Sequence, residues 1–173
     1  TDSALIPRGR LKNTPTPGTA ILHADKDGLE RQESWNYPSV IGQLNYLAQN
    51  SRPDISFAVH QCARFSKEPR ALHEKAVKRI IYYLQCTRDK PLIMKPNKSL
   101  SLDAYCDSDF AGVWHQEYAH LRDSCLSRTG FIIVLAGVPI HWSSKLQTEI
   151  ALSSTEAEYI ALSQCCRALL PMR

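Results

Sequence analysis

Apolar residues recur at helical spacing in three consecutive segments of the chain, residues 38–49, 52–68 and 71–85. Pro38 stands where the first turn of a helix tolerates proline, and Pro69 ends the second segment. The apolar faces are Val40, Ile41, Leu44 and Leu47, then Ile55, Ala58, Val59, Cys62 and Phe65, then Leu72, Ala76, Val77, Ile80, Ile81 and Leu84. Because the connections are short, the pattern predicts three helices in a compact, mostly antiparallel unit.

From residue 91 onward the period of the pattern changes from helical spacing to two. Residues 91–95 suggest a short strand, and Leu100, Leu102, Ala104 and Cys106 alternate with polar residues, so that Asp107 is expected on the opposite face of a second strand. Two further runs, residues 129–135 and 140–143, enclose a turn at 136–139 and predict a hairpin. A last helix is expected from about 155 to 170, capped by Ser153 or Ser154, with Ile160, Ala161 and Leu169 facing the sheet.

This order of elements predicts an α/β (α+β) fold in three parts. Residues 1–34 contain prolines and glycines without a sustained period and read as a linker or extended arm. Residues 35–98 form the helical unit, and residues 99–173 form a mixed sheet with one packed helix. The sheet of the last part is expected to be incomplete.

The composition is that of an ordinary globular chain, and the charge distribution is compatible with binding a polyanion. The chain is 43% hydrophobic and 22% charged, and its apolar runs are shorter than the roughly 20 residues that cross a bilayer, so a membrane partner is not expected. Residues 1–98 carry 16 basic and 9 acidic residues, a net charge of +7, whereas residues 99–173 have a net charge of −3. A basic half can hold a polyanion, although solvated helices are also often basic.

The six cysteines do not form a CxxC pair and are expected to be reduced thiols of an intracellular protein. A zinc site from His115, His120 and Cys125 is conceivable but lacks a fourth ligand at a familiar spacing. Trp114 and Trp142 are expected to pack in the core or on the hairpin.

Two acidic motifs are the strongest chemical signal. Asp107 and Asp109 stand at the end of a predicted strand, and Glu156 and Glu158 stand in the first turn of the last predicted helix. Carboxylates held by rigid elements are what a two-metal phosphodiester-cleaving site requires. The same residues could instead be helix N-terminal acids that complement the helix dipole, or residues of a strand-end turn.

Six sequence blocks resemble the Pol polyprotein of copia-type retrotransposons, in the family's order and over about residues 35–170. The blocks are Tyr37-Pro38-Ser39-Val40-Ile41-Gly42-Gln43-Leu44-Asn45-Tyr46-Leu47, Ser51-Arg52-Pro53-Asp54-Ile55, Ala76-Val77-Lys78-Arg79-Ile80-Ile81-Tyr82-Tyr83-Leu84, Asp107-Ser108-Asp109-Phe110-Ala111-Gly112, Ser127-Arg128-Thr129-Gly130 and Ser153-Ser154-Thr155-Glu156-Ala157-Glu158-Tyr159. The resemblance implies that residues 35–98 are the thumb and connection end of a reverse transcriptase. It implies that residues 99–173 begin a ribonuclease H domain, which cleaves the RNA of RNA–DNA hybrids.

The resemblance also assigns roles to single residues. Asp107 matches a catalytic metal ligand, Glu158 matches the second ligand better than Glu156 does, and Asp109 would support a ligand. The implied cofactor is Mg²⁺ or Mn²⁺, expected only for a completed site. The polymerase Asp-Asp motif is expected upstream of Thr1 and the later ribonuclease H carboxylates beyond Arg173, so this chain is expected to lack both complete activities.

The predicted third helix carries Lys75, Lys78, Arg79 and Tyr82 on its polar face. With the resemblance, this face is expected to contact the backbone of an RNA–DNA hybrid or a primer–template duplex; otherwise it is a solvated face. The other implied partner is the remainder of the Pol polyprotein, and the implied locations are cytoplasmic virus-like particles and the nucleus. Two alternatives stay open: a degenerate or domesticated nucleic-acid-binding or structural module without catalysis, and a different two-metal nuclease or integrase-like domain.

Overall fold

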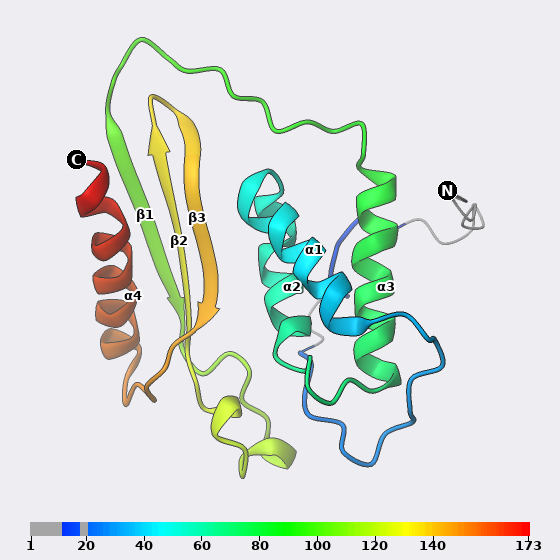
Figure 1. Ribbon diagram of the computed structural model, residues 1–173. Coiled ribbons are helices and arrows are strands. Elements are labelled where there is room, and N and C mark those ends of the chain that lie inside the picture. The colour runs from blue at the N-terminus through cyan, green and yellow to red at the C-terminus, as the bar shows by residue number, and fades with distance from the viewer. Residues whose placement is uncertain (1–11, 18–20) are drawn as a thin grey trace.

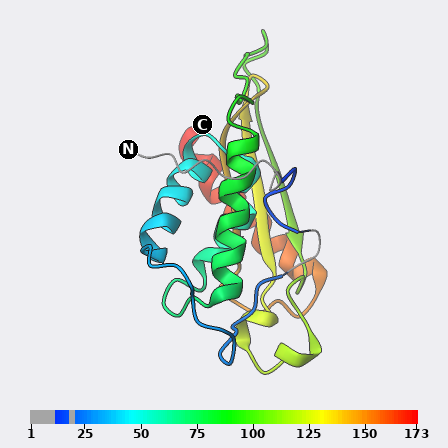
Figure 2. The same cartoon turned by 90° about the vertical axis from the view of Figure 1, so that its right-hand side faces the viewer.

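The computed structural model of the chain describes residues 12–17 and 21–173; residues 1–11 and 18–20 of the predicted arm lie outside this range. The described part has an α+β fold, as predicted, in which α4, a three-stranded sheet, the α1 and α2 pair, and α3 follow one another from left to right in Figure 1. Viewed from the α3 side, Figure 2 shows α3 in front of the sheet. The elements are α1 (Tyr37–Asn50), α2 (Ser56–Ala63), α3 (Ala71–Cys86), β1 (Leu102–Asp109), β2 (Arg128–Leu135), β3 (Val138–Leu146) and α4 (Ser154–Leu169).

The three helices of the helical unit form where the apolar spacing predicts them. The side chain of Asn36 caps α1 by accepting from the Ser39 N–H at 2.9 Å. The second helix starts with a 3-10 turn at Pro53–Ile55 and ends at Ala63, so its predicted extension to residue 68 is wrong. The Ser66 hydroxyl donates to the Ala63 carbonyl at 2.8 Å, which supports a turn where the helix was expected to continue.

The apolar core of the helical unit is contiguous. Its buried members are Leu22, Tyr37, Ile41, Leu44, Ala48, Ile55, Ala58, Val59, Cys62, Val77 and Ile80. The Tyr37 hydroxyl donates to the Cys62 carbonyl at 3.0 Å, so the polar end of this buried ring has a partner. Leu72, predicted to be buried, is 44% exposed, because the part of α3 that carries it borders an open cavity rather than α2.

Described segments of the N-terminal region lie along α3. The Ala71 N–H donates to the Leu29 carbonyl at 2.9 Å, and a ring nitrogen of His73 lies 2.9 Å from the His23 carbonyl. Leu22 adds an apolar contact by joining the helical core. This region therefore covers part of the helix face that the sequence suggested as a binding surface.

An extended connection links Cys86 to β1, and the short strand predicted at residues 91–95 does not form. Pro91 and Pro96 lack the N–H that a ladder needs, and Ile93 is 76% exposed instead of packed. Within the described residues, the sheet has the order β1-β2-β3 with both pairs antiparallel. Both residues of the hairpin turn, Ala136 and Gly137, have positive φ angles of 51° and 83°, which matches the twist of the strands.

Helix α4 covers one face of the sheet and packs mainly against β1 and β2. The Ser153 side chain caps it by accepting from the Glu156 N–H at 3.1 Å, and the small residues Ala157 and Ala161 are fully buried against the strands. Trp114 does not pack as predicted, because it lies in the loop after β1 with 55% of its surface exposed. Among the described helices none is long and apolar enough to cross a membrane.

Candidate functional site

Asp107 lies on the face of β1 that α4 does not cover. Along β1, exposed residues alternate with half-buried ones, and Asp107 belongs to the exposed set together with Tyr105 and Asp109. Its partner on β2 is Gly130, which has no side chain to cover the carboxylate. Asp107 also borders a cleft of about 400 Å³ whose other walls include Phe57 of α2 and Trp142 of β3. The carboxylate therefore faces the side of the sheet that carries the helical unit.

The two glutamates of α4 differ in their local roles. The Glu156 carboxylate accepts from the Leu152 N–H at 2.7 Å, while the Ser153 hydroxyl accepts from the Glu156 N–H. The Glu156 carboxylate thus accepts from the backbone just before the cap residue Ser153, so Glu156 helps to hold the chain where the helix begins. Glu158 is exposed, and among the described contacts it has neither a hydrogen bond nor an ion pair. Of the two acids, Glu158 is the one free to bind a ligand.

Asp107 and Glu158 do not form one site in this structure. The β1 residues that face α4 are Cys106 and Ser108. The Gln147 amide links the two elements, because it lies near the Ser108 hydroxyl and donates to the Ala157 carbonyl of α4 at 2.9 Å. Because side chains alternate along a strand, Asp107 points away from the helix that carries Glu158. A shared divalent ion needs its carboxylates on the same side, so the two residues by themselves do not fit a two-metal site.

Other metal-ligand sets are also missing from the part of the chain that the structure describes. It contains no group of three or more histidine, cysteine, aspartate or glutamate side chains placed to hold an ion. This includes the conceivable zinc set of His115, His120 and Cys125. Instead, the His115 ring lies beside the rings of His23 and Tyr118, and His23 and Tyr118 stack with their centroids 3.9 Å apart. His115 of this loop therefore packs beside His23 of the N-terminal region.

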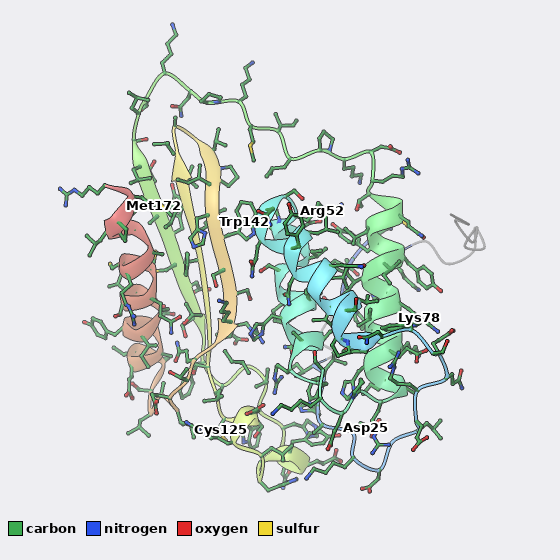
Figure 3. All side chains as sticks on the ribbon, viewed as in Figure 1. Asp25, Arg52, Lys78, Cys125, Trp142 and Met172 are labelled. Atoms are coloured by element: carbon green, nitrogen blue, oxygen red, sulfur yellow. The ribbon has the colours of Figure 1, made fainter. Side chains whose placement is uncertain are left out.

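Two of the four residues proposed for nucleic-acid contact are engaged within the protein. The ammonium of Lys78 lies 2.7 Å from a Glu33 carboxylate oxygen and 2.8 Å from one of Glu74, and these partners raise its pKa. Arg79 donates to the backbone carbonyl and the hydroxyl of Thr14 at 3.2 and 2.9 Å. Figure 3 shows Lys78 on the side of α3 away from the sheet. The ammonium of Lys78 is therefore already paired with two carboxylates of the same chain, and a polyanion would have to displace them.

The other two residues differ in exposure. Lys75 is exposed, whereas Tyr82 is half-buried. Both line a cavity of about 620 Å³ between α2, α3 and the N-terminal region, together with Lys12 and Leu72. The basic face that the sequence predicted is therefore split between an exposed lysine and groups held by the N-terminal region.

A polar cluster at the junction of the three helices was not predicted from the sequence. Arg52 donates twice to the Asp54 carboxylate, from Nε at 2.9 Å and from Nη2 at 2.7 Å, and its Nη2 also lies 2.6 Å from the Thr87 hydroxyl. The Tyr83 hydroxyl donates to Asp54 at 2.7 Å. The sequence feature that could have predicted this cluster is Arg52-Pro53-Asp54, because the proline fixes a turn that places the two opposite charges side by side. This cluster fastens the start of α2 to the end of α3.

A second unpredicted cluster joins the sheet to α2. Arg128 of β2 is only 6% exposed, its guanidinium lies 4.8 Å above the Phe57 ring, and its Nη1 lies 3.2 Å from Nδ1 of His60. Burial, followed by the nearby charges of Arg128, Arg64 and Lys145, lowers the pKa of His60 to about 4. The imidazole is therefore neutral at pH 7 and can accept a hydrogen bond from Arg128.

Relatives of this chain are transposon proteins. Over 129 residues it is 40% identical to a putative transposon Ty5-1 protein of Saccharomyces cerevisiae, covering 74% of this chain and 39% of the relative. Over 145 residues it is 40% identical to the retrovirus-related Pol polyprotein from transposon RE1 of Arabidopsis thaliana, covering 84% of this chain and 9% of that polyprotein. The chain is thus similar to part of a transposon protein and to part of a retrotransposon Pol polyprotein. It spans well under half the length of these two relatives.

One further relative has nearly the same length as this chain. It is the secreted RxLR effector protein 161 of Plasmopara viticola, which is 37% identical over 128 residues, or 74% of this chain and 84% of the relative. No family model matches the chain. No solved structure matches it either.

Proposed function

We propose that this segment joins the reverse transcriptase and ribonuclease H regions of a copia-type Pol polyprotein. The observation that carries the proposal is the order of the elements that bear the acidic motifs: Asp107 stands near the end of β1 and Glu158 in the first turns of the helix packed on the same sheet, with their side chains on different sides of it. The helices α1 to α3 precede this unit, as the thumb and connection would. The 40% identity to Pol polyproteins supports the same assignment at a coarser level.

In the longer polyprotein, Asp107 and Glu158 would be two of the ligands that hold Mg²⁺ or Mn²⁺ in the ribonuclease H site. When bound, the ions supply polarisation of the phosphate and activation of water. This segment alone contributes two exposed carboxylates that point to different sides of the sheet. A complete site would need further carboxylates, with the acids on the same side of the sheet, so the segment by itself is expected to be inactive.

The test compares acidic variants within a Pol polyprotein that carries this segment. Asp107→Asn and Glu158→Gln should each lower hydrolysis of an RNA–DNA hybrid by at least about 100-fold, the scale of losing a catalytic electrostatic group. The matched controls are Asp103→Asn, on the same exposed face of β1, and Glu156→Gln, in the same helix turn, which should keep activity within about threefold. Full activity of Asp107→Asn would refute the assignment.

The nucleic-acid partner in this proposal is an RNA–DNA hybrid or a primer–template duplex that lies along α3. Lys75 is its most accessible contact, whereas Lys78 and Arg79 must first release Glu33, Glu74 and Thr14. Contacts to the phosphate backbone weaken as salt rises, because binding releases counterions. Lys75→Ala should therefore weaken binding of a labelled hybrid and reduce its salt dependence, while Lys67→Ala, outside α3, should change neither.

A second candidate is a nucleic-acid-binding or structural module that has lost catalysis. It is favoured by the relative of nearly the same length, which is named as an effector protein and not as a polyprotein. The two candidates differ in the polyprotein experiment: a non-catalytic module would bind the hybrid with the same salt dependence whether or not Asp107 is replaced. In that case no variant of Asp107 or Glu158 would change hydrolysis by the polyprotein.

A further inference from the structure

The cavity of about 620 Å³ between α2, α3 and the N-terminal region has a mainly apolar wall. Its volume lies in the range of about 300–1,000 Å³ that small-molecule sites usually have. The wall draws apolar side chains from all three parts, including Pro15, Ile21, Leu22, Ala58, Leu72 and Ala76. A wall of this kind favours a ligand with an apolar body, because contact with such a body removes apolar surface from water.

The charged side chains around this cavity are all basic in the part of the chain that the structure describes: Lys12, Lys75, Lys78 and Arg79. Lys78 is already paired with carboxylates, and Arg79 donates to a backbone carbonyl and a hydroxyl. Lys75 is exposed and has neither an ion pair nor a hydrogen bond among the described contacts. The charges therefore favour an anionic ligand over a cationic one, and Lys75 can pair with it.

A buried amide in the wall of the cavity has an unused donor. The Gln61 side chain is 2% exposed, and its Oε1 accepts from Arg64 Nη1 at 3.1 Å. This bond fixes which end of the amide is the oxygen, because a guanidinium can donate but not accept. Gln61 Nε2 has no hydrogen-bond partner among the described residues. A buried N–H without a partner costs free energy, which a ligand oxygen that accepts from it would recover.

The two polar groups lie toward the same end of the cavity. The rings of Phe65 and His73 stack with their centroids 4.2 Å apart, so the chain just after α2 lies beside the first turn of α3. Gln61 belongs to the last turn of α2, and Lys75 lies near the start of α3. From Lys75 the cavity continues to Tyr82, which lies about 10 Å further along the helix axis. The cavity thus offers a polar end and an apolar wall that follows α3.

We propose that this cavity binds an unbranched fatty acid. The carboxylate pairs with the Lys75 ammonium and accepts from Gln61 Nε2, and the alkyl chain lies along α3 toward Tyr82. A nucleotide is also an anion, but its sugar hydroxyls would lose water against the apolar wall without gaining partners. The inference rests on the cavity and does not depend on the proposed function.

The test titrates the full chain with dodecanoate below its micelle concentration and follows binding by calorimetry. Dodecanol has the same alkyl chain without the charge, and dodecylamine carries the opposite charge. Dodecanoate should bind as one molecule per chain, at least about tenfold more tightly than dodecylamine. In heteronuclear NMR, the side-chain NH₂ signals of Gln61 should shift when dodecanoate is added. Absence of saturable binding, or equal affinity for dodecanoate and dodecylamine, would overturn the proposal.

A lysine variant tests the position of the carboxylate. Lys75→Ala should weaken dodecanoate binding by about fivefold and leave dodecanol binding within about twofold. The control Lys67→Ala removes an exposed lysine that does not line the cavity, and it should change neither affinity. Equal losses for dodecanoate and dodecanol in Lys75→Ala would show that Lys75 does not bind the carboxylate.

A larger side chain tests the position of the alkyl chain. Ala76→Leu narrows the cavity without changing its charge, so binding of dodecanoate and dodecanol should each weaken by at least about tenfold. The control Ala119→Leu makes the same change at an exposed position outside the cavity and should keep both affinities. Circular dichroism checks that each variant is folded. Unchanged binding by a folded Ala76→Leu variant would show that the ligand lies elsewhere and would overturn the proposal.

Discussion

The indole N–H of Trp142 on β3 donates to the backbone carbonyl of Ala48 on α1 at 2.6 Å, across 94 positions of the sequence. Ala48 lies in the last turn of α1, where carbonyls have no partner within the helix. The next N–H available to it, that of Arg52, donates to Leu47 instead. Trp142 therefore satisfies a helix end and joins the sheet to the helical unit, between which Figure 3 places it.

Replacing Trp142 with phenylalanine should lower the free energy of unfolding by about 1–2 kcal/mol. The change removes the donor and leaves the Ala48 carbonyl unpaired, while an aromatic ring remains at the site. Urea unfolding followed by circular dichroism measures the change. Trp114→Phe is the control, since Trp114 is largely exposed, and its effect should stay below about 0.5 kcal/mol. Equal losses in the two variants would mean that the Ala48 bond contributes nothing.

Asp54→Asn should lower the free energy of unfolding by about 1 kcal/mol at pH 7. The variant weakens the bonds that Asp54 receives from Arg52 and Tyr83. Burial raises the pKa of Asp54, but the hydrogen bonds from Arg52 and Tyr83 outweigh burial and lower it below 3.8. The stabilisation is therefore complete above pH 3.8 and is lost as the pH falls through the lower folded-state value.

The measurement is the difference in unfolding free energy between wild type and Asp54→Asn at several pH values. The difference should be constant from pH 7 to 5 and shrink below pH 4. Asp89→Asn is the control, because the Asp89 side chain is 94% exposed and its ion pair with Arg88 is long at 3.8 Å. A difference that grows on acidification would contradict the role of the Asp54 carboxylate.

His60 should make the chain less stable as the pH falls from 6.5 to 4. Its pKa is lowered from 6.5 to about 4 in the folded state, first by burial and then by Arg128, Arg64 and Lys145. Between these pH values the unfolded chain binds a proton that the folded chain excludes, so acidification favours unfolding by up to about 3 kcal/mol.

The His60→Gln variant tests this pH dependence, because glutamine can still accept from Arg128 but does not titrate. Its free energy of unfolding should fall less between pH 7 and 4.5 than that of the wild type. His23 and His73 are present in both chains, so their effects cancel in the comparison. The exposed His141 provides the control variant His141→Gln, which should keep the wild-type slope. An unchanged slope for His60→Gln would refute the prediction.

Gln147→Met should lower the free energy of unfolding by about 2 kcal/mol. Gln147 is 1% exposed, and its amide donates to the Ala157 carbonyl at 2.9 Å and the Thr129 hydroxyl at 3.2 Å. Methionine fills a similar volume but leaves these groups with one partner fewer. Thermal unfolding measures the loss, with Gln43→Met on the exposed side of α1 as control. A stable Gln147→Met variant would show that α4 is held by apolar packing alone.

Periodicity predicted the elements well where a single face is buried. The spacing from Val40 to Leu47 gave α1, and alternation from Leu102 to Cys106 gave β1 with Asp107 on the exposed side. Periodicity failed at residues 91–95, where β-branched and apolar side chains occur without a strand that could pair with them. A strand forms only when another strand, often distant in the sequence, pairs with it, and the local pattern of residues does not show whether such a strand exists.

The sequence predicts Asp107 and Glu158 as metal ligands, and that role stays a prediction, but their arrangement could not be predicted. Of the two expected cap residues, Ser153 and Ser154, it is Ser153 that caps α4. That α4 covers the opposite side of the sheet from Asp107 depends on chain connections that no local pattern records. The pairing of Lys78 with Glu33 could not be predicted from the local sequence either, because the two residues lie 45 positions apart.

We propose that Asp107 and Glu158 are two acids of a ribonuclease H site, and the structure places them on different sides of the sheet. The most direct measurement is hydrolysis of a labelled RNA–DNA hybrid by the folded chain with Mg²⁺ or Mn²⁺, wild type beside Asp107→Asn. We expect no cleavage by either protein and retained, salt-dependent binding of the hybrid. Cleavage by the wild type that disappears in Asp107→Asn would contradict it.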